Sequence, residues 1–394
     1  MARIPRVILL IESSRAFGRD LLRGIANYTK RHGAWTFYHA APFFIESNRE
    51  QRIHDLSKLK QWGATGIIMR EMDNMEKLLD MGLPTILSRI QSPPVPGTID
   101  ITVADTDAGW MAAEHLINSG FRHFAYCGWD QFHWSREREK GFIQRIKQAG
   151  YTVHRFQPPT LGLQYRRETM QSHLITWLWS LPKPVGLMTC VDEQSQYVLE
   201  ACRMAELHVP EDVAIIGCDN DDLICDLAHP TLSSVALSGE QAGYAAAELL
   251  HRLMTGKPAR KKKLMIYPTY VEVRQSTDVL AMKDPAMVEA LRFIRNNADR
   301  PIQVTDVVNA TSISYRALHN KFQISLERSI DAEIRRTRAE FIGRRILDTS
   351  QSISEIALDL DFTDVEHISR FFKRETGMSP LEYRKRYRSA DGGQ

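Results

Sequence analysis

The first two thirds of the chain alternate short, continuously apolar runs with longer stretches of helical periodicity. The apolar runs are Val7–Ile11, Gly66–Met69, Pro84–Leu87, Ile101–Val103, Phe124–Tyr126, Gly186–Met188 and Val213–Ile216. The helical stretches between them are Phe17–Lys30, Ala108–Ser119, Arg136–Ala149, Glu193–Glu206 and Gly239–Met254. Apolar strands that alternate with helices are typical of parallel sheets covered on both faces. The strands are too many for one small sheet, so the pattern predicts a doubly wound α/β domain with two lobes.

The pattern changes past Thr277, where strand-like runs end and short helical segments begin. One longer amphipathic stretch covers Leu326–Leu347. We therefore expect an α/β domain at 1–275, a linker at 276–284 and an all-α domain at 285–390. The basic run Gly256–Lys263 fits a solvated turn before a strand at 264–267 better than a nucleic-acid patch.

The last hundred residues contain an internal repeat with an offset of 50. The matching pairs are Ser314 with Asp364, Leu318 with Ile368, and Phe322 with Phe372. Ser and Asp are helix N-cap residues, and apolar residues four apart form a buried stripe on a helix. Each copy follows a short helical pattern, so the repeat predicts two helix-turn-helix units, at about 303–322 and 353–373.

The second copy carries three motifs in order, Asp348–Phe362, His367–Lys373 and Gly377–Arg384, and resembles the DNA-binding domain of the AraC/XylS family. The resemblance covers about residues 285–388. It implies two helix-turn-helix units that bind successive major-groove segments of double-stranded DNA. The family usually has Gly in the turn before the recognition helix, where this chain has Ser312 and Asp361. Asp tolerates a left-handed backbone better than Ser, so we expect the first unit to be strained or to turn differently.

Base-reading candidates are the solvent-facing residues early in the second helix of each unit. They are Tyr315, Arg316, His319 and Asn320 in the first unit, and Val365, Glu366, His367 and Arg370 in the second. Arg chelates guanine, Asn pairs with adenine and Glu accepts from cytosine, and each bidentate contact discriminates by about 1–3 kcal/mol. The alternative is that these are ordinary exposed polar residues. The resemblance favours a DNA-reading function for Arg316 and Arg370 above the others.

The front domain carries its own ordered set of motifs. These are Ile101–Gly109, Gly120–Gly128, Arg136–Phe142, Val209–Asn220 and Pro230–Val235. Their order resembles the effector domain of LacI/GalR repressors, which is similar to periplasmic sugar-binding proteins, over roughly residues 6–275. The resemblance implies two lobes with chain crossovers near 105–118 and 235–240. The combination of both domains resembles, over the full length, the regulators of xylose operons.

The resemblance implies a small carbohydrate effector, xylose or a related sugar, held between the lobes. A sugar needs charged groups for its hydroxyls and an aromatic plate for its ring face. Carried over by position, the candidate ligand residues are Phe17, Arg19, Asp105, Trp134, Arg138, Asp192 and Asp219, with Trp129 and Phe132 as further stacking surfaces. Asp219 as a helix cap, Arg19 as a surface residue and Trp134 as a core residue are the alternatives. Leu237 stands where the repressors often have a polar contact, which leaves open a non-pentose effector.

The charge, the cysteines and the start of the chain bear on where the protein acts and on which kinds of site it can form. The net charge is +3, and residues 285–394 hold 18 basic and 16 acidic side chains, so bulk charge gives no argument for nucleic-acid binding. The five cysteines lack metal-ligand spacing and are expected to be reduced thiols. The apolar start is too short for a signal peptide, which predicts a cytoplasmic protein.

We find no motif for catalysis, and expect no enzyme activity, cofactor or metal. The resemblance implies a homodimer that regulates transcription, with RNA polymerase as a further partner. Two competing hypotheses are a transport-type solute receptor, disfavoured by the missing signal peptide and the helical tail, and a DNA-alkyl transferase, disfavoured by the spacing of the cysteines.

Overall fold

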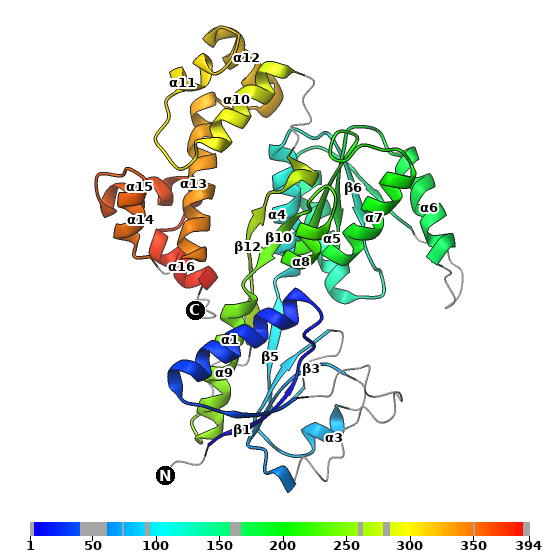
Figure 1. Cartoon of the computed structure of the whole chain (residues 1–394), viewed down its shortest axis with the longest axis vertical. Helices are drawn as coiled ribbons and strands as arrows, with labels where there is room; N and C mark the ends of the chain where they lie inside the picture. Colours follow the sequence, from blue (N-terminus) through cyan, green and yellow to red (C-terminus); the bar gives the residue numbers. More distant parts are fainter. Residues whose placement is uncertain are drawn as a thin grey trace.

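The computed structural model describes residues 4–39, 61–72, 75–90, 95–157, 167–258, 263–278, 284–349 and 351–388. Two α/β lobes are followed by a helical domain that lies beside them (Figure 1). The predicted fold class, two parallel-sheet lobes and an all-α helix-turn-helix domain, is confirmed.

Lobe 1 contains a six-stranded parallel sheet in the order β11-β5-β4-β3-β1-β2. Its strands are β1 (Arg6–Leu10), β2 (Thr36–His39), β3 (Gly66–Arg70), β4 (Thr85–Ser88), β5 (Thr98–Val103) and β11 (Lys263–Ile266). The helices α1 (Ala16–His32) and α9 (Gly239–Met254) pack together over one core of this sheet, and the short α3 (Glu76–Leu79) contributes to another. Lobe 1 is thus built from both ends of the front domain.

Lobe 2 contains a second six-stranded sheet in the order β12-β10-β9-β8-β6-β7, parallel except for β12. Its strands are β6 (His123–Cys127), β7 (Val153–Arg155), β8 (Val185–Thr189), β9 (Val213–Asp219), β10 (Ser233–Leu237) and β12 (Pro268–Glu272). Its helices are α4 (Asp105–Asn118), α5 (His133–Gln148), α6 (Arg167–Ser180), α7 (Asp192–Met204) and α8 (Asp222–Leu227), followed by the 3₁₀ turn η2 (Gln275–Thr277).

The chain crosses between the lobes three times, at Ala104, Ser238 and Tyr267. The first crossing precedes residues 105–118, because α4 packs on α5 inside lobe 2. The crossing at Tyr267 was absent from the sequence prediction. Ala104 donates its N–H to the carbonyl of Ile266 at 2.8 Å, and Ser238 and Tyr267 exchange two hydrogen bonds of 2.9 Å. The hinge is therefore a hydrogen-bonded bundle of three segments.

The helical domain comprises two small cores joined by one long helix. Its helices are α10 (Pro285–Asn296), α11 (Val304–Asn309), α12 (Tyr315–Leu326), α13 (Ile330–Asp348), α14 (Ile353–Asp359), α15 (Val365–Thr376) and α16 (Pro380–Arg388). The first core contains residues of α10–α13, and the second contains residues of α13–α15 packed by α16. The helix predicted from Leu326 starts later than expected, because Glu327 adopts a left-handed backbone and Ser329 caps α13.

The predicted capping and stripes of the repeat are confirmed. Ser314 accepts from the N–H of Ala317, and Asp364 accepts from the N–H of His367. Leu318, Phe322, Ile368 and Phe372 are all completely buried.

The turns before the two recognition helices differ as the sequence suggested. Asp361 adopts φ 56°, the left-handed conformation that Asp tolerates. Ser312 is not among the described residues with positive φ, so the first turn takes a different path.

Two predicted segments lie partly outside the described residues. Residues 279–283 of the linker and 259–262 of the basic run are among these. Residues 275–277 form η2, whose Ser276 and Thr277 are buried against lobe 2. The strand expected at 264–267 is β11, one residue earlier.

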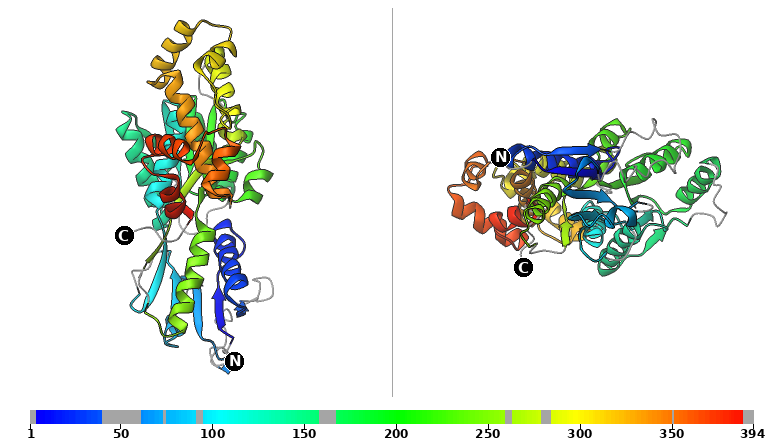
Figure 2. Two further views of the ribbon diagram at one scale, coloured as in Figure 1. Left: turned by 90° about the vertical axis from the view of Figure 1, so that its left-hand side faces the viewer. Right: turned by 90° about the horizontal axis from the view of Figure 1, so that it is seen from below.

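The helical domain contacts both lobe 2 and the hinge (Figure 2). Near the first unit, Arg122 donates to the carbonyl of Ser325 at 2.6 Å and Arg328 donates to Asn118 at 3.0 Å. Near the second unit, Tyr383 donates its hydroxyl to the carbonyl of Thr269 at 3.2 Å. Both helix-turn-helix units are thereby attached to lobe 2.

Candidate ligand cavity and nucleic-acid interface

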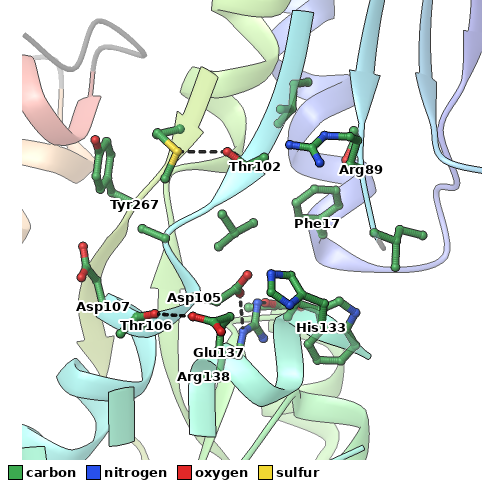
Figure 3. Close-up of a pocket in the computed structure, with 18 of the residues that line it drawn as sticks. Phe17, Arg89, Thr102, Asp105, Thr106, Asp107, His133, Glu137, Arg138 and Tyr267 are labelled. Atoms are coloured by element: carbon green, nitrogen blue, oxygen red, sulfur yellow. Dashed lines mark hydrogen bonds and ion pairs between the residues drawn. The ribbon is translucent and has the colours of Figure 1, made fainter. Parts of the chain in front are cut away.

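A cavity of about 580 Å³ lies between the lobes at the carboxyl ends of the strands (Figure 3). Its polar and aromatic lining comes from lobe 1, lobe 2 and the hinge. These residues include Arg15, Phe17, Arg70, Ser88, Arg89, Thr102, Asp105, Thr106, Asp107, His133, Trp134, Glu137, Arg138, Asp219, Lys263 and Tyr267. Five of the seven predicted ligand residues, Phe17, Asp105, Trp134, Arg138 and Asp219, line this cavity.

Arg138 forms the centre of a charged triad on the lobe-2 wall. The residue is 3% exposed, and its guanidinium lies 2.9 Å from both Asp105 and Asp219. It also donates to the carbonyl of Cys190 at 2.7 Å. Arg138 thus donates two hydrogen bonds, to Asp105 and to Cys190, and forms an ion pair with Asp219, so it holds both carboxylates at the cavity wall.

Two glycines bring Arg138 and Asp105 together. A Cβ on Gly109 would lie 1.8 Å from the carbonyl oxygen of Arg138, and one on Gly141 would lie 1.8 Å from that of Thr106. Only glycine allows α4 and α5 to approach this closely. The close approach sets the start of α4, where Asp105 lies, against the middle of α5.

The pKa values of two members of the triad, Asp105 and Arg138, are shifted from their ordinary values. Burial raises the pKa of Asp105 from 3.8 to about 6, although the charge of Arg138 acts in the opposite direction. Burial also opposes the charge of Arg138, but Asp219 and Asp105 outweigh it and raise the pKa of the guanidinium. Arg138 is therefore charged throughout the physiological range, while Asp105 titrates close to it.

Aromatic side chains border the triad on one side. The Trp134 ring lies 5.1 Å from the guanidinium carbon of Arg138 and stacks on Phe132 with an interplanar angle of 17°. Trp129 contacts both rings edge-on. Of the three, Trp134 is the one that lines the cavity, and Phe17 faces it from lobe 1.

Arg19 and Asp192 do not line the cavity. Arg19 forms an ion pair of 2.5 Å with Asp221, whose other oxygen accepts from the N–H of Ala16 at 2.9 Å. Asp192 is fully buried and accepts from Ser234 at 2.6 Å and from the N–H of Asp221 at 2.7 Å. Burial raises the pKa of Asp192 well above its ordinary value. Both side chains therefore support Asp221, which bonds lobe 2 to the start of α1.

The prediction missed several cavity residues on lobe 1 and on the hinge. Arg70 and Arg89 lie at or just after the ends of β3 and β4, and Glu137 directly precedes Arg138. The rule that ligands bind beyond the carboxyl ends of parallel strands would have pointed to both arginines. No sequence signal marked Tyr267, because its place depends on the third crossing.

The arginines of the cavity are balanced by carboxylates. Arg15 pairs with Glu193 at 2.9 Å, Arg89 with Asp100 at 3.0 Å, and Arg70 with Glu12. Arg138 has its two aspartates. An additional charged group on a ligand would disturb these pairs, whereas an uncharged polyol would exchange hydrogen bonds with them.

The candidate base-reading residues lie on the outer faces of α12 and α15. Tyr315, Arg316 and Asn320 are exposed, and His319 is half-buried and stacks on Tyr315. On α15, Val365, Glu366, His367 and Arg370 are exposed. Neither Arg316 nor Arg370 has an ion-pair partner among residues 284–349 and 351–388. The two guanidinium groups are thus available to a nucleic-acid partner.

Three further observations concern the cysteines, the metal-ligating residue types and the helices of the described part of the chain. All five cysteines are free and buried, and burial raises the pKa of Cys127, Cys190 and Cys202 to about 12. No group of three His, Cys, Asp or Glu suited to a metal ion occurs among the described residues. None of the helices described here has the length and apolarity needed to cross a bilayer.

Sequence comparison finds relatives along nearly the whole chain. Residues 113–277 match a periplasmic binding protein-like domain, and residues 307–386 match a helix-turn-helix domain. The chain is 29% identical to the xylose operon regulatory protein of Escherichia coli K12 over 96% of both chains, and 28% identical to that of Haemophilus influenzae over 96% of this chain and 98% of the relative.

Structural comparison gives the same picture. A structure of the xylose-binding transcription activator XylR matches with a TM-score of 0.61 and 26% identity, covering 98% of each chain. A ribose-bound LacI family regulator from Enterococcus faecium shares the fold of the front domain, with a TM-score of 0.54 and 21% identity over 71% of this chain and 100% of that one. The expected resemblance to xylose-operon regulators is confirmed.

Proposed function

We propose that this chain is a sugar-responsive, DNA-binding transcriptional regulator. The observation that carries the proposal is the coexistence, in one chain, of an interlobe cavity with a buried Arg138 triad and a pair of capped helix-turn-helix units. Similarity to xylose operon regulatory proteins over 96% of both chains supports the same function. The regulator would act in the cytoplasm, beside its DNA.

The effector is an uncharged monosaccharide, with D-xylose as the first candidate. The balanced charges of the cavity support a neutral ligand, and 580 Å³ is ample for a single sugar ring. Asp105 and Asp219 would accept from sugar hydroxyls, Arg138 would orient both carboxylates, and Trp134 would stack on the ring face. The names of the relatives favour xylose, and a different polyol is the alternative outcome.

The DNA target is a pair of adjacent major-groove segments. Arg316 and Arg370 would each chelate a guanine, and the neighbouring exposed residues of α12 and α15 would extend the readout. A homodimer would place four such helices on one operator, and RNA polymerase would be the partner that responds to the bound regulator. Sugar binding closes the lobes and changes how these helices meet DNA.

A calorimetric titration tests the effector. We expect one sugar among D-xylose, D-ribose, L-arabinose, D-glucose and xylitol to bind the wild-type chain. Trp134→Leu should weaken that binding at least tenfold, since it removes the stacking plate. Trp179→Leu is the matched control, because Trp179 is 59% exposed on α6 and does not line the cavity. Failure of every sugar to bind, or equal losses in both variants, would overturn the assignment.

A further inference from the structure

Tyr267 contacts the ligand cavity and the DNA-binding domain at once. It lines the cavity at the third crossing between the lobes, and Figure 3 shows it on the side of the cavity nearest the helical domain. Its ring meets that of Tyr387, on α16, edge-on at 6.2 Å. The guanidinium of Arg386 lies over both rings, at 5.7 Å from Tyr267 and 5.5 Å from Tyr387.

The ring contacts continue from α16 to the second recognition helix. Tyr387 packs on Tyr383 at 4.6 Å, and Tyr383 meets Phe372 of α15 edge-on at 5.1 Å. Phe372 is completely buried in the core of the second unit. Tyr267, Tyr387, Tyr383 and Phe372 thus form a continuous aromatic column from the sugar cavity to a DNA-reading helix.

The Tyr267 end of the column is fixed to the hinge. Tyr267 exchanges two hydrogen bonds with Ser238, and the neighbouring Ile266 accepts from Ala104, so all three crossings are tied to it. Rotation of one lobe against the other changes the backbone of these segments. Because Tyr267 lies in one of these three crossing segments, its ring must move relative to lobe 2 when the lobes close.

The column has a second attachment, on lobe 2, through Tyr383. Tyr383 donates to the carbonyl of Thr269 on β12, two residues beyond Tyr267. The helical domain is therefore held by one contact that belongs to lobe 2 and by another that belongs to the hinge. A change in the angle between these two contacts would turn α16, and α15 with it.

We propose that this aromatic column is the element that couples the sugar site to the second helix-turn-helix unit, with Tyr267 and Tyr387 as its positioning residues. The inference rests on the proposed function and adds the path of regulation. Aromatic side chains suit this role, because their edge-on packing is directional and transmits a rotation rather than absorbing it.

The informative variant is Tyr387→Leu in the full-length chain. Tyr387 does not line the sugar cavity, so the affinity for D-xylose without DNA should stay within about threefold of wild type. The conservative variant Tyr387→Phe keeps the ring and should retain coupling. Tyr270→Leu is the matched control, since Tyr270 lies on β12 and contacts Arg344 of the helical domain, but does not line the sugar cavity.

The measurement is the Kd for a duplex selected by the wild-type chain from a randomised library, determined by fluorescence anisotropy with and without D-xylose. The wild-type ratio of the two values should be about 5- to 150-fold. We expect the ratio to fall to within about twofold of unity in Tyr387→Leu, and to stay within twofold of wild type in Tyr387→Phe and Tyr270→Leu. By reciprocity, the duplex should shift the Kd for D-xylose by the same ratio in each protein.

The outcomes distinguish a failure of the aromatic column from a failure of the proposed function. A wild-type ratio near unity would overturn the proposed function together with the column. A normal wild-type ratio that persists in Tyr387→Leu would overturn the column alone. The same holds if Tyr270→Leu lowers the ratio as much as Tyr387→Leu, because any disturbance of the domain interface would then suffice.

Discussion

Replacing Arg138 should destabilise lobe 2 strongly, and more strongly as the pH rises. In Arg138→Met the side chain keeps its approximate length but Asp105 and Asp219, which are 11% and 14% exposed, lose their cation. The carbonyl of Cys190 also loses its donor. Removing one partner of a buried ionic cluster costs about 3–5 kcal/mol. We expect a loss of that size in the free energy of unfolding at pH 8.

The sign of the pH dependence follows from Asp105. Its pKa is about 6 in the folded chain against 3.8 as the ordinary value, so between these values the folded state binds more protons than the unfolded state. The wild-type contribution of Asp105 is therefore most favourable below about pH 4, and about 3 kcal/mol is lost as the pH rises through 6. Without Arg138 the pKa of Asp105 rises further, so the stability deficit of the variant shrinks as acid neutralises Asp105.

Urea unfolding followed by tryptophan fluorescence measures this effect, because Trp134 lies beside Arg138. Arg145→Met is the matched control, two turns further along α5, where the partner Glu114 is 41% exposed. A partly exposed pair contributes about 1 kcal/mol or less. Equal losses in the two variants, or a loss in Arg138→Met that does not change between pH 5 and pH 8, would refute the buried triad.

Substitutions at three further residues test other contacts. Asp221→Ala removes the carboxylate that accepts from both Arg19 and the N–H of Ala16. The variant should favour the open arrangement of the lobes and weaken sugar binding by about 10- to 100-fold. An unchanged Kd for the sugar, measured by calorimetry, would contradict the bridging role of Asp221. Asp192→Ala leaves the N–H of Asp221 and the hydroxyl of Ser234 without their acceptor. It should lower the free energy of unfolding, measured with urea, by about 2–4 kcal/mol, and Asp192→Asn should lower it much less. Equal losses of stability in the two variants would disprove an acceptor role for Asp192. Arg370→Ala should weaken a selected duplex by about 1–3 kcal/mol in anisotropy titrations and relax the preference at one base pair; a uniform loss at every position would indicate a phosphate contact instead.

The sequence predicted most interior strands, because a strand buried on both faces is usually continuously apolar, but it missed the interior strand β10, which begins with two buried serines. The runs around Val7, Ile67 and Ile215 all became central strands. The edge strands β2, β7 and β12 carry polar or half-exposed residues, and their pattern does not distinguish them from loops. The antiparallel β12 and the crossing at Tyr267 went unnoticed for this reason.

The candidate ligand residues show a similar division. Position along the chain placed Asp105, Arg138 and Asp219 near the cavity, because the carboxyl ends of the strands and the helix starts converge there. The direction of a side chain within one helical turn depends on packing that a single sequence does not contain. Arg19 points to Asp221 and Asp192 lies behind the cavity wall, although both are close to it along the chain.

The long helix α13 sets a constraint on the DNA that this chain can recognise. Its 19 residues extend about 28 Å and contribute to the core of each unit at either end. A rigid strut of this kind keeps α12 and α15 at one separation and one relative angle. Inserting half a helical turn of base pairs between the two subsites would rotate one of them to the opposite side of the duplex, beyond the reach of its helix. Operators for this chain should therefore vary in base sequence, but not in the spacing between their two subsites.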